Sequence, residues 1–224
     1  MVGMIEASAE HFTTDVLPLY HGPFIKIRLQ PSEREYTVSK TLLCAKSPVF
    51  SAMFHHGFRE YEEQTATLQE EGGIISIRSI QALIQWLYTR IINFDISDKE
   101  EHVIELARLA DKYSITGIES YVAQDIRDTI RSPDSTSWLT SEHIISGTFL
   151  PRGHPVRRTL AAACVYGFLQ YKNHKFAREA EDYPTSGADL LREVQLALNT
   201  SNEPHRAVTF TDPLDDVTVH LRRA

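Results

Sequence analysis

Cysteine is scarce in this chain. Cys44 and Cys164 are the only two cysteines among 224 residues, and neither belongs to a Cys-x-x-Cys motif. So few cysteines, placed so far apart, exclude a disulfide framework and a zinc site built from cysteine pairs. We therefore expect a protein of a reducing compartment that is stabilised by a hydrophobic core, which a content of 42% hydrophobic residues can supply.

Long apolar runs are absent as well. The longest, from Leu160 to Leu169, is about half of the ~20 residues that a membrane-spanning helix needs. The first residues contain Glu6, Glu10 and Asp15, whereas a secretory signal would begin with basic residues and an apolar run. We expect no membrane span, no secretory signal and an intracellular protein of the cytoplasm, the nucleus or both.

The sequence also lacks the motifs of common catalytic and metal sites. There is no His-Glu-x-x-His, no Gly-x-Ser-x-Gly and no phosphate-binding glycine loop. The histidines are expected at the surface or at helix ends, and Cys44 is expected to act as a small apolar residue. The sequence thus predicts that the protein is not an enzyme and uses no cofactor and no metal.

One segment contains no acidic residue. The whole chain has 23 Lys and Arg against 30 Asp and Glu, a net charge of −7, yet no Asp or Glu lies between His143 and Arg178. The positive residues of this basic segment are Arg152, Arg157, Arg158, Lys172, Lys175 and Arg178. Charges spread so widely favour a solvated helix face, and binding to nucleic acid or to an acidic partner stays open as an alternative.

The first part of the chain shows strand and short-helix patterns. Apolar and polar residues alternate from Phe24 to Leu29 and again from Tyr36 to Val38, which predicts a β-hairpin. A short helix is expected over 41–45. A second is expected from Pro48, because Ser47 precedes it as a capping residue.

The middle of the chain predicts two strands followed by three helices. Short β-prone runs occupy 65–69 and 74–77. Ser79 is expected to cap a helix with the most regular amphipathic spacing in the chain. Two more helical patterns, over 103–113 and 118–126, predict a helical hairpin broken at 114–117.

The last part of the chain divides by composition. Residues 131–141 are rich in Ser, Thr and Pro and are expected to form a linker. Residues 142–198 show further helical patterns, beginning near Ser141 and Pro155 and recurring over 188–198. Residues 199–224 are expected to form a mobile tail with a short strand at 217–221.

Four blocks of sequence then indicate a family. In chain order they are YTVSKTLLCAKSPVFSAMF from Tyr36, GFRE from Gly57, WLYT from Trp86 and LARLADKY from Leu106. Together they resemble the BTB/POZ domain, in the style of the family's fungal branch. The resemblance implies an α+β fold over residues 20–130, a short sheet flanked by helices, with an additional C-terminal helical region and an extension at 1–19. Ser39 replaces a common histidine, and Pro23-Phe24 replace an acidic residue, which weakens a transcriptional-repressor interpretation.

The resemblance also implies a function. Family members are protein-interaction modules, often homodimers, and many are substrate adaptors that bind cullin-three in a ubiquitin ligase. The family's usual cullin contact is a hydrophobic-x-Glu element after the second helix, which Phe58 and Glu60 match, and the region of Tyr88 tends to lie near that surface. An aromatic anchor beside a carboxylate is a typical arrangement for a binding hot spot. The client protein is not identified.

Alternatives remain open at this stage. Phe58 would pack on Phe54 and Glu60 would be merely solvated if the element were not a binding site. The protein would then be a self-association or chromatin scaffold without a ligase role. An acidic cluster nearby would either attract a basic partner or protect the edge of the sheet from pairing. Its members are Glu60, Glu62, Glu63, Glu70 and Glu71.

Overall fold

The computed structural model describes residues 20–94, 96–132, 138–199 and 209–221. The predicted extension at 1–19, the middle of the predicted linker and the first part of the predicted tail lie outside these residues. Among the described residues, no helix is both long enough and apolar enough to cross a lipid bilayer.

The chain divides into two compact units. Unit 1 contains the residues up to Asp95 together with Leu109–Gly117, and unit 2 contains Ile96–Arg108 together with the chain from Ile118 onward. The range 20–130, expected as one module, therefore contributes residues to both units. Each unit has its own buried core.

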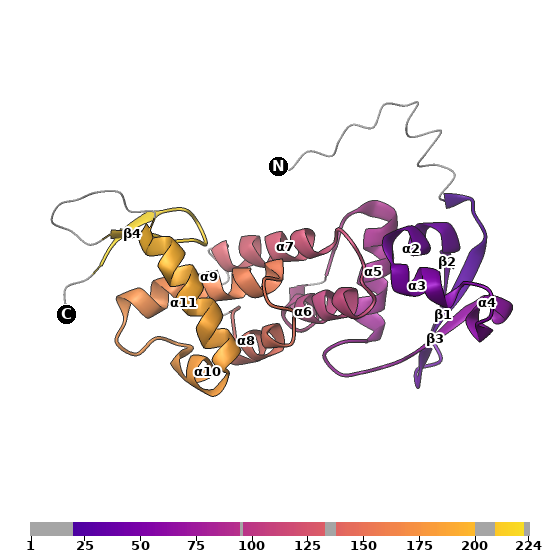
Figure 1. Ribbon diagram of the computed structural model, residues 1–224, viewed down its shortest axis with the longest axis horizontal. Helices are drawn as coiled ribbons and strands as arrows, with labels where there is room; N and C mark the ends of the chain where they lie inside the picture. The colour runs from indigo at the N-terminus through magenta and orange to yellow at the C-terminus, as the bar shows by residue number, and fades with distance from the viewer. Residues whose placement is uncertain (1–19, 95, 133–137, 200–208, 222–224) are drawn as a thin grey trace, which may run out of the picture. The chain divides into compact units, whose positions relative to one another are not determined.

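A three-stranded sheet forms one side of unit 1 (Figure 1). Its order is β2 (Glu35–Ser39), β1 (Phe24–Gln30) and β3 (Thr65–Gln69), with β1 antiparallel to β2 and parallel to β3. The hairpin predicted from the two alternating runs is confirmed, as is the strand predicted at 65–69. Alternation along β1 buries Ile25, Ile27 and Leu29 on one face of the sheet.

Short helices surround this sheet. They are α2 (Lys40–Lys46), α3 (Pro48–Met53), α4 (Arg59–Glu63) and α5 (Ile77–Thr89). The predicted cap of α3 is confirmed, because the Ser47 Oγ accepts a hydrogen bond of 3.0 Å from the Phe50 N–H. Phe50 and Trp86 are among the largest fully buried side chains.

The strand predicted at 74–77 is wrong. Ile75 forms only an isolated bridge with Glu71, and α5 already begins at Ile77. Ser76 caps this helix together with Ser79 in a capping box, so the true cap lies three residues before the predicted one. The β-branched isoleucines favour a strand locally, but the serine pair satisfies the first N–H groups of a helix that has a strongly apolar face.

Residues 109–117 belong to unit 1 and contribute Tyr113 and Ile115 to its core. The Tyr113 ring stacks on the Phe50 ring with centroids 4.7 Å apart, and the Ser47 hydroxyl donates to the Tyr113 carbonyl at 2.5 Å. Ser114 and Gly117 have positive φ angles of 49° and 90°. These left-handed residues end the helix at the predicted break.

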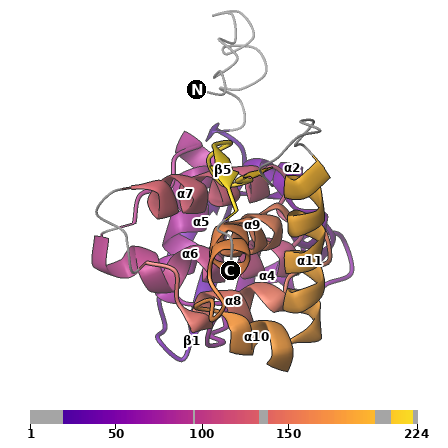
Figure 2. The same cartoon turned by 90° about the vertical axis from the view of Figure 1, so that its left-hand side faces the viewer.

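Unit 2 is helical and is organised around α9 (Pro155–Gln170). The other helices are α6 (Ile96–Lys112, here as far as Arg108), α7 (Glu119–Arg131), α8 (Ser141–Thr148), α10 (Ala177–Asp182) and α11 (Pro184–Asn199). Figure 2 views the molecule nearly along α9, with α11 at its side and α8 and α10 below it. All these helices except α10 follow predicted patterns. Residues on most sides of α9 are buried, which is typical of a central helix.

A small hairpin lies in the described part of the tail. β4 (Thr209–Thr211) pairs antiparallel with β5 (Thr218–His220) and contacts α11. The short strand predicted at 217–221 is confirmed, whereas β4 was not predicted. Phe210 of β4 is fully buried and lies beside Tyr166 of α9, so the hairpin packs onto the helices.

Candidate functional site

Phe58 and Glu60, two of the three predicted contact residues, lie on a short segment of unit 1 next to β3. Gly57 has φ +98°, which lets the chain turn, and Phe58 is extended at the N-terminal end of α4. Gln64 ends α4 in the left-handed region, with φ 48°. We call residues Phe58–Gln64 the α4 surface.

Phe58 is exposed rather than packed in the core. Its exposed fraction is 54%, whereas the nearby Phe54 is 3% exposed. Glu60, half-buried, forms no ion pair within the described part of the chain. The structure thus carries the aromatic ring and the carboxylate on one segment at the surface, and their role in binding stays a prediction.

The α4 surface has an excess of negative charge. Arg59 donates to Glu63 at 2.6 Å, and this hydrogen bond raises the pKa of Arg59. Glu62 is exposed and, like Glu60, forms no ion pair among the described residues, although the charge of Glu60 also acts on Arg59. One acid of α4 is therefore ion-paired and two are not.

The rest of the predicted acidic cluster is engaged elsewhere. Glu70 accepts a hydrogen bond of 3.1 Å from the backbone N–H of Ser32. Glu71 pairs with Lys112 at 2.5 Å. These two residues hold loops of unit 1, and only the acids of α4 remain for a partner.

Tyr88 and Ser39 have internal hydrogen bonds. The Ser39 backbone N–H donates to the Tyr88 hydroxyl at 2.8 Å, and the Tyr20 hydroxyl donates to the Tyr88 carbonyl at 2.8 Å. Ser39 is fully buried, and its Oγ caps α2 by accepting from the Leu42 N–H at 3.2 Å. Ser39 therefore has a structural role where the family commonly has a histidine. Tyr88 is half-buried, and its place in a partner surface stays a prediction.

The basic segment of unit 2 forms ion pairs with acids of the same unit. Arg158 Nε lies 3.4 Å from Glu193 and Arg178 Nε lies 3.3 Å from Asp182. The Lys175 ammonium donates to the Leu139 carbonyl at 2.5 Å. Arg152 and Lys172 are exposed. Acids of α10 and α11, which lie outside the segment in sequence, thus offset part of its charge.

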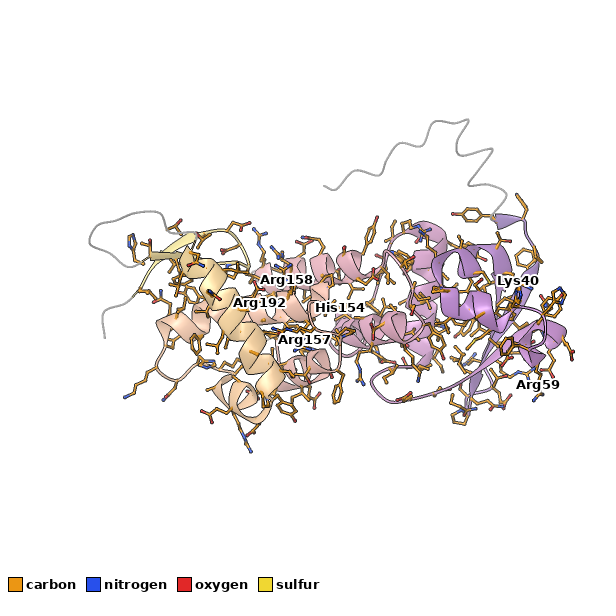
Figure 3. The ribbon with its side chains drawn as sticks, viewed as in Figure 1. Lys40, Arg59, His154, Arg157, Arg158 and Arg192 are labelled. Carbon is orange, nitrogen blue, oxygen red and sulfur yellow. The ribbon has the colours of Figure 1, made fainter. Side chains whose placement is uncertain are left out.

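Arg157 is buried and holds the helices of unit 2 together. It is ion-paired with Asp189 of α11 and is 9% exposed. Its guanidinium also donates to the carbonyls of Leu150 at 3.0 Å and of Thr185 at 3.2 Å. Each of the three guanidinium nitrogens therefore donates to an acceptor inside the protein. Figure 3 labels Arg157 and Arg158 on successive positions of α9.

A cavity of about 500 Å³ lies within unit 2 between α7, α9, α11 and the β4–β5 hairpin. Its volume is in the range of small-molecule pockets. Ala123, Ala162 and Ala197 contribute small side chains to the wall. The charged residues of its lining are Arg127, Arg158, Glu193 and Asp216. Both signs are present in equal number, so the lining does not select a ligand charge.

No group of three or more His, Cys, Asp or Glu among the described residues could hold a metal ion. His154 and His143 lie at helix N-termini, as predicted for histidines at helix ends. Burial raises the pKa of the Cys164 thiol to about 12 and also raises the pKa of the Cys44 thiol, so neither is a ready nucleophile.

Comparisons with known proteins give consistent matches. A family model for the BTB/POZ domain matches residues 20–129. A BTB/POZ domain-containing protein of Arabidopsis thaliana is 27% identical over 166 residues, which are 70% of this chain and 27% of that protein. A second one from the same plant is 31% identical over 93 residues, which are 42% of this chain and 26% of that protein. Kelch-like protein 25 of Rattus norvegicus is 21% identical over 188 residues, which are 84% of this chain and 29% of that protein.

The chain thus spans less than a third of the length of these relatives. The family match begins just before β1, ends within α7 and includes the α4 surface. The small sheet with its surrounding helices is the α+β fold that the sequence blocks implied. The BTB domain is a non-enzymatic module for protein–protein interaction. Residues 20–129 form a BTB/POZ domain, and the chain belongs to the BTB/POZ domain family.

Proposed function

We propose that this chain is an interaction adaptor whose α4 surface binds a cullin of the cullin-three type. The observation that carries the proposal is the exposure of Phe58, 54%, beside the carboxylate of Glu60. Covering apolar surface contributes about 25 cal/mol per Å². Aromatic anchors seated in a partner's pocket commonly dominate the binding free energy.

The charge of the α4 surface supports the same proposal. Glu60 and Glu62 form no ion pair in the described part of unit 1. Unbalanced carboxylates around an apolar anchor favour a partner whose pocket is bordered by Lys or Arg. The proposed contact therefore has an apolar centre and an acidic surround.

The test compares two exposed phenylalanines of unit 1. Phe24 is 53% exposed, at the start of β1, and Phe58 is 54% exposed. Binding to the purified N-terminal helical repeats of cullin-three is measured by isothermal titration calorimetry. We expect Phe58→Ala to weaken binding about 30-fold, as for a hot-spot residue, and Glu60→Lys to abolish it. Phe24→Ala should bind as the unchanged protein does.

Two outcomes would contradict the proposal. One is tight binding by both α4 variants, and the other is loss of binding by Phe24→Ala alone. Far-ultraviolet circular dichroism of each variant shows whether the fold is retained. Because Phe58 and Glu60 lie outside the buried core, we expect no change in the spectrum.

We also propose that the module self-associates, as the family resemblance implies, and that the helical region beyond it binds a client of unknown identity. Size-exclusion chromatography with light scattering is expected to show a dimer at micromolar concentration. A dimer without cullin binding would instead favour the second candidate, a self-association scaffold without a ligase role. A monomer that binds the cullin repeats would remove the self-association proposal only.

A further inference from the structure

The α4 surface has little intrinsic support. None of the residues of α4 is buried, and Phe58 at its N-terminal end makes no side-chain capping bond. A helix of five residues cannot persist through its own hydrogen bonds. Contacts from elsewhere in unit 1 must hold it, and the structure shows where they come from.

Lys40 provides the contact from the neighbouring helix. It is the first residue of α2, and its backbone N–H donates to the Pro23 carbonyl at 2.8 Å, so the base of the side chain is fixed. Its Nζ lies 4.9 Å from the centroid of the Tyr61 ring and 5.6 Å from that of the Phe54 ring. An ammonium at these distances is attracted by the electron-rich face of each ring.

The same ammonium reaches the end of α4. Lys40 Nζ donates to the Gln64 Oε1 at 3.4 Å. Gln64 in turn donates from its side-chain amide to the Tyr61 carbonyl, and its own carbonyl accepts from the Lys26 N–H at 2.9 Å. Gln64 thus connects α4 with both β1 and Lys40.

Tyr61 is held from a second direction. Its hydroxyl lies 3.1 Å from His56 Nε2, and the two rings have centroids 4.1 Å apart. Tyr61, Gln64 and Lys40 are all half-buried, which reduces the competition from water. In the described part of the chain Lys40 has no carboxylate partner, so its charge is directed to the rings and the amide.

We infer that Lys40 is the positioning residue of the α4 surface: its ammonium holds Tyr61 and Gln64, and through them it fixes the direction in which Phe58 and Glu60 face a partner. Figure 3 labels Lys40 beside α2 and Arg59 on α4. The inference about binding rests on the proposed function. The ordering of α4 by Lys40 does not, because it concerns the free protein.

The test uses three variants of lysines in α2. Lys40→Met keeps the length and apolar stem of the side chain but removes the charge, and Lys40→Arg keeps a cation. Lys46→Met is the matched control, because Lys46 is also half-buried in α2 but its ammonium makes no cation–π contact among the described residues. Amide hydrogen exchange of residues 59–65 is measured by mass spectrometry on the full chain, and cullin-repeat binding is measured by calorimetry.

We expect Lys40→Met to raise the exchange rate of α4 about tenfold or more and to leave that of α5 unchanged. Its affinity for the cullin repeats should fall about tenfold. Lys40→Arg should restore both values to within about threefold, and Lys46→Met should change neither. Restoration by arginine distinguishes a role of the charge from a loss of packing.

Three results would overturn the inference. The first is an unchanged exchange rate of α4 in Lys40→Met. The second is equal acceleration of α4 and α5, which would show a general loss of stability. The third is faster exchange with full affinity, which would show that order in α4 does not position the contact. If the unchanged protein does not bind the cullin repeats, the proposed function fails, and the exchange arm still decides whether Lys40 orders α4.

Discussion

The α4 surface of unit 1 and the basic segment of unit 2 differ in how their charges are paired. In unit 1, Glu60 and Glu62 of α4 form no ion pair among the described residues and lie next to an exposed phenylalanine. In unit 2, Arg157 is buried against Asp189, and Arg158 is paired with the buried Glu193. The basic segment is therefore partly balanced in the folded unit, because acids of α10 and α11 that follow it in sequence pair with its arginines.

The unfolding of each unit can be followed separately by tryptophan fluorescence. Each contains one of the two tryptophans of the chain, Trp86 in unit 1 and Trp138 in unit 2, and both are buried. Trp138 fluorescence in a Trp86→Phe background therefore reports unfolding of unit 2. Trp86 fluorescence in a Trp138→Phe background reports unfolding of unit 1.

The largest effect is expected from breaking the buried ion pair of unit 2. Asp189→Ala leaves the Arg157 guanidinium buried without its carboxylate, which costs about 3–5 kcal/mol in the free energy of unfolding. Urea unfolding followed by Trp138 fluorescence measures this loss. The control is Asp182→Ala, which removes the partner of a well-exposed Arg178 and should cost less than about 1 kcal/mol. Equal losses of unfolding free energy in the two variants would show that the cost of removing an acid does not depend on the burial of its ion pair.

A smaller effect is expected at a close approach of two helices in unit 2. A Cβ on Gly147 of α8 would lie 2.6 Å from the Cδ1 of Leu160, which is itself buried in α9. Gly147→Ala therefore forces a shift that costs about 1–3 kcal/mol, measured by the same Trp138 unfolding curve. Gly167→Ala, in α9 of the same unit, is the control, because the nearest atom to its Cβ position, the His174 Cβ, lies at an ordinary contact distance of 3.8 Å. A neutral Gly147→Ala would mean that α8 and α9 can separate without loss.

In unit 1 the buried polar contact that corresponds to the Arg157–Asp189 pair of unit 2 is made by a serine hydroxyl and involves hydrogen bonds only. Ser47 caps α3 through the Phe50 N–H at 3.0 Å and donates to the Tyr113 carbonyl at 2.5 Å. Ser47→Ala removes both bonds at a fully buried position and should cost about 1–2 kcal/mol, read from Trp86 fluorescence during urea unfolding. Ser51→Ala, exposed on the same helix, should have no measurable effect. A similar loss in both variants would assign the effect to helix propensity.

Periodic burial made most of the fold predictable from the sequence. β1, β3 and α5 each expose one face and bury the other, and the alternation or the 3.6-residue spacing is visible in their residues. α4 and α10 have no buried residues, so no periodic pattern marks them. β4 has the single buried residue Phe210 between two half-buried threonines, so it too shows little periodicity.

The candidate site was predictable only where its residues lie close together in the sequence. Phe58 and Glu60 lie two positions apart, so a short motif contains both. Lys40 is remote from Tyr61 in sequence, and its role depends on a ring that folding brings to its ammonium. Arg157 likewise has the same residue type as the exposed Arg152, and only the position of Asp189 on α11 distinguishes them.

The smallest effect is expected at a buried carboxylic acid of unit 2. Burial, aided by the charges of Asp215 and Asp216, raises the pKa of Asp212 above its ordinary value, although the Leu214 N–H donates to its Oδ1 at 2.9 Å. The unfolded chain therefore releases this proton at lower pH than the folded chain does. As a result, the contribution of Asp212 to stability falls as the pH rises from the ordinary pKa of 3.8 through the raised one.

Asp212→Asn isolates that contribution, because an asparagine stays neutral and its side-chain oxygen can still accept from the Leu214 N–H. Its free energy of unfolding should approach that of the unchanged protein near pH 4 and exceed it at pH 7, measured through Trp138 fluorescence in urea. A constant difference across this pH range would mean that Asp212 ionises alike in both states. The hairpin would then resemble the α4 surface, where carboxylates remain in contact with water, rather than the ion-paired interior of unit 2.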